Sequence, residues 1–243
     1  MSDPQTTTER LYSKYHSFNQ RPAVTDPEVR RVSSLSFRRS LGDWLPRDRA
    51  VRVLDIACGE GALLHCLRSE GFSALSGFDI SPENVRLCHD LGLSFVQQAD
   101  ALRLSERPES GFDLIFAFDL IEHIPKQAAA GFLEQVRAKL APGGCIILQT
   151  PNMGSLYAAY NRYYDLSHEF GVTEKSAVDL LMLAGFGRSA IEVKPAWTAT
   201  TALGRLREWY VRLLHRCIFL GEGGRRPRIP TMNLLIRAVH PKG

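Results

Sequence analysis

The chain has 243 residues, of which 44% are hydrophobic and 23% are charged, and its formal net charge is +4. This is enough apolar material for one sizeable core. Because no run approaches the ~18 apolar residues that cross a bilayer and the polar start lacks a signal-peptide core, we predict a cytoplasmic protein without a transmembrane segment.

A turn with two glycines follows the first predicted strand, residues 52–56. Gly59 and Gly61 lack a Cβ atom, so the chain can turn sharply there and a ligand can approach the backbone before the predicted helix over 62–68. Leu64 stands where a dinucleotide fingerprint has its third glycine, and Asp55 would repel a pyrophosphate. The turn therefore favours a cationic or zwitterionic ligand.

Two further predicted strands, 74–79 and 94–98, are also followed or ended by an acid. Asp79 ends the first of them, where doubly wound folds accept ribose hydroxyls. Asp100 follows the second and could accept a hydrogen bond from an adenine amino group. The pattern predicts one ligand cleft, with Asp55, Asp79 and Asp100 at three successive strand ends.

The rest of the chain alternates between strand and helix patterns. Residues 1–45 are predicted as helical segments, apart from a main domain over 46–243. The later predicted elements are a strand over 112–118, an amphipathic helix over 127–140 stopped by Pro142-Gly143-Gly144, a strand over 145–150, a loop over 151–168, a helix over 174–184 with Thr173 as its N-cap, a strand over 189–194 and a closing strand over 232–240.

From about Val51 to Phe186 the chain resembles the class I S-adenosylmethionine-dependent methyltransferases. The motifs are Val-Leu-Asp-Ile-Ala-Cys-Gly-Glu-Gly, Gly-Phe-Asp-Ile-Ser, Gln-Gln-Ala-Asp-Ala, Phe-Asp-Leu-Ile-Phe-Ala-Phe-Asp-Leu-Ile-Glu-His-Ile and Leu-Ala-Pro-Gly-Gly-Cys-Ile-Ile-Leu. The resemblance implies an α/β, Rossmann-like fold, with a seven-stranded, mostly parallel sheet whose last strand is antiparallel and helices on both faces.

The resemblance also implies roles for individual residues. Residues 1–45 would form a lid, with Tyr12, Tyr15 and His16 facing the cleft. The implied cofactor contacts are Asp55, Gly59 and Gly61 for the methionine moiety, Asp79 for the ribose, Asp100 for the adenine, and Ile80, Ala101 and Phe118 beside the ligand.

Transfer of a methyl group to a hydroxyl needs a residue that removes the hydroxyl proton. His123, in Asp-Leu-Ile-Glu-His after the fourth strand, is one candidate for this base, and in many small-molecule O-methyltransferases a Glu-His pair occupies this place. His168 is the other, in an Asp-x-x-His-x-x-x-x-Thr segment that resembles methyltransferases of bacterial polysaccharide clusters. For each histidine a purely structural role stays open.

A third interpretation groups Asp119, Glu122 and His123 as ligands of Mg²⁺, which would acidify an acceptor diol, and ubiquinone-pathway O-methyltransferases look similar here. The same strand end lacks the Asn/Asp-Pro-Pro-Tyr of enzymes that methylate base amines or glutamine. We therefore expect no nucleic-acid partner.

A basic amphipathic helix is predicted over 202–220, within an insertion at about 200–229. Leucines and aromatic residues recur at helical spacing, arginines stand between them, and Arg225-Arg226-Pro227-Arg228 follows. Residues 203–228 could lie at the inner face of a membrane. The alternative is that the apolar stripe packs on its own domain or on a second subunit of a homodimer.

Together these features favour an O-methyltransferase that uses S-adenosylmethionine and acts on a sugar hydroxyl in bacterial surface-polysaccharide biosynthesis. An alternative acceptor is a phenolic or quinone-precursor small molecule. An alternative of another class is a non-catalytic cofactor-binding subunit.

Overall fold

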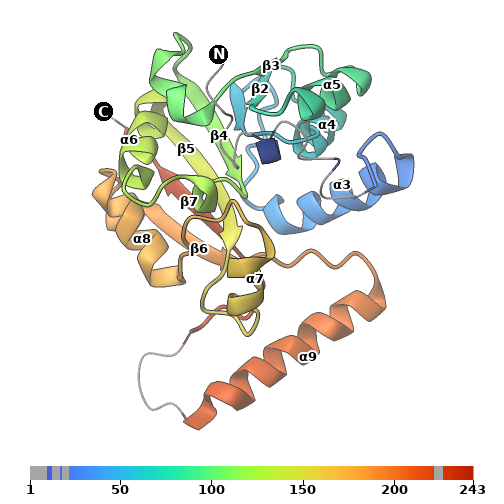
Figure 1. Cartoon of the computed structure of the whole chain (residues 1–243), viewed down its shortest axis with the longest axis vertical. Helices are drawn as coiled ribbons and strands as arrows, with labels where there is room; N and C mark the ends of the chain where they lie inside the picture. Colours follow the sequence, from blue (N-terminus) through green and yellow to red (C-terminus); the bar gives the residue numbers. More distant parts are fainter. Residues whose placement is uncertain (1–9, 13–16, 18–21, 222–226, 243) are drawn as a thin grey trace.

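A seven-stranded sheet runs through the centre of the computed structural model, which describes residues 10–12, 17, 22–221 and 227–242 (Figure 1). The strands are β1 (Val53–Ile56), β2 (Leu75–Asp79), β3 (Val96–Gln98), β4 (Phe112–Phe118), β5 (Leu140–Pro151), β6 (Ile191–Pro195) and β7 (Asn233–Val239). Their order in the sheet is β3-β2-β1-β4-β5-β7-β6, and β7 runs antiparallel to both of its neighbours. The predicted fold class is confirmed.

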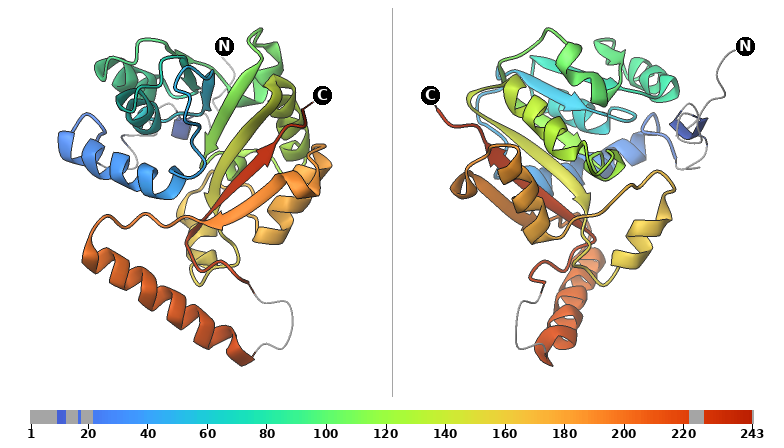
Figure 2. Two further views of the ribbon diagram at one scale, coloured as in Figure 1. Left: turned by 180° about the vertical axis from the view of Figure 1, so that it is seen from behind. Right: turned by 60° about the vertical axis from the view of Figure 1, so that its left-hand side comes forward.

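Helices cover both faces of the sheet (Figure 2). The helices of the described residues are α3 (Pro27–Leu41), α4 (Ala62–Ser69), α5 (Pro82–Asp90), α6 (Ala129–Lys139), α7 (Ala158–Tyr164), α8 (Glu174–Leu183) and α9 (Ala202–Ile218), with short 3₁₀ turns that include η1 (Ala101–Glu106) and η2 (Ile121–His123). One face packs against α6 and α8, while α3 and α4 cover the other. Thr173 caps α8 as predicted.

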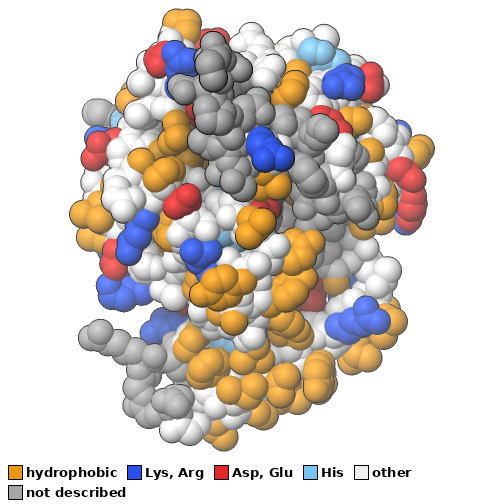
Figure 3. Space-filling model, viewed as in Figure 1, with side chains coloured by type: hydrophobic (Ala, Val, Ile, Leu, Met, Phe, Trp, Pro, Cys, Tyr) orange, Lys and Arg blue, Asp and Glu red, His pale blue; other side chains and the backbone are white. Residues whose placement is uncertain are grey.

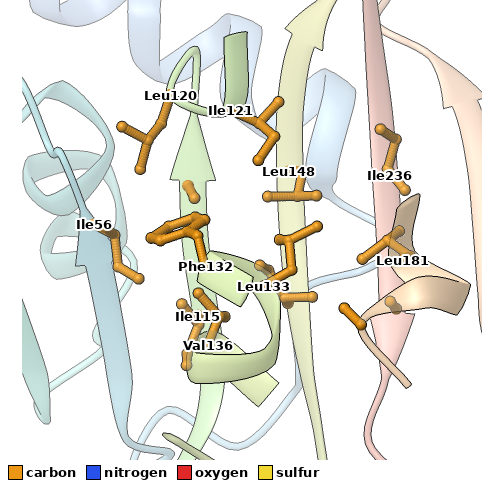
Figure 4. Close-up of a cluster of buried hydrophobic side chains, with 14 of the residues drawn as sticks. Ile56, Ile115, Leu120, Ile121, Phe132, Leu133, Val136, Leu148, Leu181 and Ile236 are labelled. Atoms are coloured by element: carbon orange, nitrogen blue, oxygen red, sulfur yellow. The ribbon is translucent and has the colours of Figure 1, made fainter. Parts of the chain in front are cut away.

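The core follows from the alternation of side chains along β4. Ile115 points into the larger cluster below α6, and Phe116 points into the cluster below α3 and α4. Figure 4 shows Phe132 and Leu133 of α6 meeting Ile115 within the larger cluster. A strand that is buried on both faces is nearly all apolar, which is why the bounds of β4 could be predicted to the residue.

Two predicted connections are wrong. The helix predicted over 127–140 is α6, but Pro142-Gly143-Gly144 is no separate turn, because β5 already pairs through Leu140 and the register shifts before Cys145. Gly143 has φ +81°, and a Cβ on Gly144 would lie 2.7 Å from the carbonyl oxygen of Phe112, so both glycines permit this irregularity. The loop predicted over 151–168 contains α7.

The predicted amphipathic helix is α9, which lies in the connection between β6 and β7 and stands apart from the sheet (Figure 1). Within the described part of the chain, no helix combines the length and apolar character needed to cross a membrane. All five cysteines are free thiols, and Cys217 on α9 is exposed.

Candidate functional site

The turn after β1 depends on both glycines, for different reasons. Gly61 has φ +80°, and a Cβ there would lie 2.6 Å from Cδ1 of Leu93 and 2.9 Å from Sγ of Cys88. Gly59 has φ +54°, but a Cβ there would meet no atom of the described residues within 4 Å. Gly61 therefore permits close packing against the core, whereas Gly59 leaves open space in which a ligand can approach the backbone.

Asp55 near the end of β1 and Asp79 at the end of β2 lie on adjacent strands, where Asp55 pairs with Gly77, and both acids are buried. The Asp79 carboxylate accepts hydrogen bonds from the backbone N–H of Gly59 at 2.8 Å and of Ser81 at 2.9 Å, and from the Asn84 amide at 3.1 Å. Burial raises the pKa of Asp79, and burial together with the charge of Asp79 raises the pKa of Asp55 well above its ordinary value. This edge of the sheet favours a positive charge.

The other predicted cofactor contacts lie at the same edge. The backbone N–H of Ala99 donates to the carbonyl of Asp79 at 3.0 Å, which places Asp100 beside the end of β2. Asp100 caps η1 by accepting a hydrogen bond from the backbone of Leu102, while Ala101 is buried behind it. The structure thus places the three acids of the successive strand ends at one edge of the sheet, and their joint contact with a ligand stays a prediction.

Ile80 and Phe118 differ in their surroundings. Ile80 is exposed after β2. The Phe118 ring, at the end of β4, meets the rings of Phe116 and Phe37 with centroids 5.6 and 6.2 Å apart. Phe118 therefore connects α3 to the strand end, and its predicted place beside the ligand stays a prediction.

This arrangement fits S-adenosylmethionine. The open space at Gly59 admits a ligand to the backbone, and the buried Asp55 and Asp79 offer acceptors and negative charge to a cation. When bound, the sulfonium supplies an already activated methyl group. The residues that would hold it are Asp55, Gly59, Asp79 and Asp100.

Replacing Asp79 by alanine is expected to weaken the binding of S-adenosylmethionine by about 1–3 kcal/mol. The reason is that the ribose hydroxyls, which would donate to this buried carboxylate, would be left unpaired in the complex. Isothermal calorimetry measures the change. Asp90→Ala, at the exposed end of α5, is the matched control and should leave the affinity unchanged. An unchanged affinity in Asp79→Ala would contradict the assignment.

The two histidines proposed as bases lie together with a glutamate. The ring centroids of His123 and His168 are 4.8 Å apart, and a potential ligand atom from each ring and from Glu122 lies within 4.8 Å of the others. Glu122 is buried and accepts a hydrogen bond from the Thr150 hydroxyl at 3.0 Å. The sequence alone did not predict this cluster, because His168 lies far along the chain from Glu122 and His123.

Hydrogen bonds hold both rings in place. Nδ1 of His123 lies 2.9 Å from the Ser167 hydroxyl, which donates to Asp165 at 2.5 Å, and the His123 ring also hydrogen-bonds to the backbone of Ser167. Nδ1 of His168 donates to the carbonyl of Asn161 at 2.9 Å, so Nε2 of His168 is left as the nitrogen that can accept a proton. Sequence reasoning missed Ser167, although it lies in the segment that contains His168.

Two described residues other than glycine have positive φ, and they flank the site at neighbouring strand ends. Ala57 after β1 has φ +55° and Asp119 after β4 has φ +49°. Such conformations are uncommon for residues with a Cβ and gather at ligand sites. After this turn at Asp119, η2 carries Glu122 into the interior and His123 to the edge of the cluster.

Burial controls the ionisation of this cluster. It lowers the pKa of His123 to about 4, assisted by the neighbouring His168, and it raises the pKa of Glu122 well above its ordinary value. Burial also raises the pKa of Tyr12, which hydrogen-bonds to Ser167, to about 12. At neutral pH, His123 is therefore an uncharged ring.

His123 should make the protein acid-sensitive. The unfolded chain, with a pKa of 6.5, binds more protons than the folded chain between pH 6.5 and about 4. The free energy of unfolding from this group is therefore fully present above about pH 6.5 and falls with the pH through that window. We expect His123→Gln to flatten the fall, measured by thermal unfolding at several pH values. His89→Gln on exposed α5 is the control, and equal slopes in all three proteins would contradict the expectation.

The predicted magnesium ligands need correction. Asp119 is not in the cluster of potential metal ligands among the described residues; it accepts hydrogen bonds from Gln149, and His168 takes its place beside Glu122 and His123. Mg²⁺ prefers an octahedral set of oxygen ligands. Two imidazole nitrogens and one carboxylate do not fit it.

We therefore expect turnover to be unchanged after dialysis against EDTA and after addition of MgCl₂. The measurement is the rate of S-adenosylhomocysteine formation. Glu122→Gln, which removes the only carboxylate of the cluster, is measured under the same conditions and should likewise not respond to EDTA or MgCl₂. A rate that falls with EDTA and returns with Mg²⁺ would contradict this expectation.

Described parts of the N-terminal segment contact the site at three points. The Tyr12 ring lies 6.3 Å from His123 between centroids, Ser17 donates to Glu83 of α5 at 3.1 Å through its backbone N–H, and the backbone N–H of Val24 donates to Glu60 at 2.7 Å. These contacts span the strand ends from β4 to the turn after β1. Tyr15 and His16 lie outside the described residues.

Comparison with known proteins gives one family. A family model for the methyltransferase domain matches residues 20–186. The chain is 33% identical over 128 residues to a ubiquinone biosynthesis O-methyltransferase of Xylella fastidiosa, covering 50% of this chain and 48% of that protein. It is 26% identical over 167 residues to a tRNA U34 carboxymethyltransferase of Pseudoalteromonas translucida, covering 65% and 50%. The chain thus spans about half the length of these curated relatives.

Solved structures share the fold. A SAM-dependent methyltransferase from Archaeoglobus fulgidus matches 86% of this chain and 94% of its own with a TM-score of 0.64 and 21% identity. One from Mesorhizobium loti matches 84% and 97% with a TM-score of 0.60 and 19% identity. At these identities the likeness concerns the fold alone.

Proposed function

Since the chain belongs to the methyltransferase-domain family, as a class I S-adenosylmethionine-dependent methyltransferase, we propose that it methylates a hydroxyl oxygen. The observation that carries the proposal is the pair of histidine rings whose centroids lie 4.8 Å apart, in which Nδ1 of His168 is held by the carbonyl of Asn161 and Nε2 of His168 is left to accept a proton. An amine acceptor already has a lone pair when unprotonated, whereas a hydroxyl must lose its proton during transfer. As a methyltransferase, the chain is an enzyme, so the non-catalytic alternative is dropped.

The two histidines have different tasks in this proposal. Because burial lowers the pKa of His123 to about 4, that ring is a weak proton acceptor at neutral pH. His123 would orient the acceptor hydroxyl, with Ser167 and Asp165 holding its ring. His168 would take the proton at Nε2.

We propose a sugar hydroxyl in surface-polysaccharide biosynthesis as the acceptor. The Asp165–Thr173 segment supports this choice through its resemblance to methyltransferases of polysaccharide clusters. Next to it, α7 carries three exposed tyrosines, Tyr160, Tyr163 and Tyr164, and α7 is bonded to His168 through Asn161. Aromatic rings give a sugar an apolar surface and a hydroxyl partner in one side chain.

A second acceptor class is a phenolic or quinone-precursor molecule. The identity of 33% to a ubiquinone biosynthesis O-methyltransferase favours it. The same pair of histidines would serve a phenolic hydroxyl, and the tyrosines of α7 would stack on its ring.

We further propose that residues 1–45 act as a lid over the main domain of residues 46–243. The contacts of Tyr12, Ser17 and Val24 with the strand-end edge support this role. A lid would exclude water from the methyl group while it is transferred.

The acceptor is tested by incubating the full chain with labelled S-adenosylmethionine and three panels: nucleotide-activated sugars, lipid-linked saccharides and catechols. Mass spectrometry of the product locates the methyl group, and His168→Gln is the matched control for enzymatic transfer. A methylated sugar supports the first proposal and a methylated catechol the second. Methyl transfer to nitrogen, or no S-adenosylhomocysteine from any panel, would contradict O-methylation of these acceptors.

A further inference from the structure

Helix α9 exposes its apolar side chains instead of packing them. Leu206 and Trp209 are each 59% exposed and Leu213 is 44% exposed. The exposed apolar residues in and just after the helix are Leu203, Leu206, Trp209, Tyr210, Leu213, Leu214, Ile218 and Leu220. The stripe therefore does not pack on its own domain, which was one part of the alternative to membrane contact.

The inward side of α9 carries its polar contacts with the body. Glu208 pairs with Arg39 of α3 and accepts a hydrogen bond from the backbone N–H of Ala199 at 2.8 Å, and His215 is buried. At about 100° per residue, these inward positions lie opposite an apolar arc that runs over roughly 140° from Trp209 to Leu214 and is centred near Leu206 and Leu213, with Ile218 beyond its edge. The arc therefore faces away from the sheet. Figures 1 and 2 show α9 standing apart from the sheet, which leaves this side of the helix uncovered by the strands.

Arginines flank this apolar arc. Arg205, Arg212 and Arg216 lie along one side of it and Arg207 along the other, by the same helical spacing. The guanidinium of Arg212 lies 5.0 Å from the centroid of the Trp197 ring. The only acidic residue in α9, Glu208, is already paired with Arg39 on the inward side. The exposed face is thus apolar at its centre and positive at its edges.

We propose that this face of α9 docks on an anionic lipid surface, with the helix lying in the interfacial plane. Aliphatic side chains would enter the acyl boundary, Trp209 and Tyr210 would sit at headgroup depth, and the arginines would meet lipid phosphates.

Charge argues against a second copy of the chain as the occupant. Pairing two α9 faces would bring eight arginines together without an acid on either face to neutralise them, since each Glu208 is turned inward. An anionic surface neutralises the arginines and covers the apolar arc in one step.

The loop and helix before the histidine cluster extend this surface. Figure 3 shows hydrophobic side chains gathered over both α7 and α9 on one face of the molecule. On and after α7 the exposed residues include Tyr160, Tyr163, Tyr164 and Leu166. A membrane that meets α9 would also lie near α7. This inference concerns docking and holds for any acceptor.

The test is flotation of the full chain with vesicles of phosphatidylcholine alone or mixed with phosphatidylglycerol, at low and high salt. We expect binding to the anionic vesicles, weakened by salt, with a blue shift in tryptophan fluorescence that Trp209→Phe removes. Arg205→Gln with Arg216→Gln should weaken binding about 30-fold, the equivalent of about 2 kcal/mol at about 1 kcal/mol per arginine. Leu206→Asp with Leu213→Asp should abolish it.

Matched controls separate the surface from general effects. Leu183→Asp, 71% exposed on α8, and Arg86→Gln, exposed on α5, should bind vesicles like the unaltered chain. Calorimetry of S-adenosylmethionine binding checks that each variant is folded. Equal binding to neutral vesicles, no vesicle binding, or full binding by the α9 variants would overturn the proposal. So would ultracentrifugation showing a dimer that Leu206→Asp with Leu213→Asp dissociates.

Discussion

Replacing His168 by alanine is expected to lower kcat by about 10²- to 10⁴-fold, the range for removing a general base. The structure supports this size of effect because Nδ1 of His168 is held by the carbonyl of Asn161, which leaves Nε2 to accept the proton. The affinity for S-adenosylmethionine should change little, since the residues that would hold the cofactor are the strand-end acids and Gly59, and His168 is not among them. Single-turnover rates and calorimetry separate the two quantities.

His123→Ala gives the sharper comparison. Because the pKa of His123 is about 4, it should serve in orienting the acceptor, so its loss should raise KM for the acceptor and lower kcat less than His168→Ala does. The double variant should be about as slow as His168→Ala alone, since residues that act as one unit are not additive. Ser167→Ala should resemble His123→Ala in a milder form.

The matched control is His89→Ala on exposed α5, which should retain full kcat. If His123→Ala lost more of kcat than His168→Ala, the two roles would be exchanged. If both variants lost cofactor affinity and turnover equally, the histidines would be structural and the acceptor proton would need another base.

Most of the sheet could be predicted because its signals are local. A buried parallel strand is short and apolar, and the ends of β4 follow directly from that pattern. The closing antiparallel strand β7 was predicted over 232–240 and runs from Asn233 to Val239. The acids at successive strand ends could also be predicted to lie at one edge of the sheet, since carboxyl ends of parallel strands share that edge.

The histidine cluster could be predicted only in part, because its geometry is not local. Each histidine could be recognised as a candidate base from the sequence. The short distance between the two rings, however, depends on how the segment after α7 packs against η2. There the backbone N–H of Glu169 donates to the carbonyl of Glu122 at 2.8 Å. The partner roles of Ser167 and Asp165 follow from the same long-range contact. Which face of α9 points outward likewise depends on the pairing of Glu208 with Arg39. The helical periodicity of the sequence cannot predict this contact between two distant helices.

Gly61→Ala is expected to lower the free energy of unfolding by about 2–5 kcal/mol. A left-handed backbone costs a residue with a Cβ about 1–2 kcal/mol. Overpacking adds about 1–3 kcal/mol, because the new methyl would lie 2.6 Å from Cδ1 of Leu93, which is fully buried and cannot move aside. Since a natural domain is stable by only about 5–15 kcal/mol, this one methyl group should lower Tm clearly. Chemical denaturation measures the change.

Gly59→Ala tests whether this turn contributes to cofactor affinity independently of the stability of the fold. Its backbone also has positive φ, but the added Cβ would meet none of the described residues within 4 Å, so the stability should fall by only about 1–2 kcal/mol. If the cofactor approaches the backbone through this space, Gly59→Ala should lose more affinity for S-adenosylmethionine than stability, and Gly61→Ala the reverse. Gly131→Ala, in α6 with equally open space, is the control for adding a methyl group. Unchanged calorimetric affinity in Gly59→Ala would place the cofactor away from this turn.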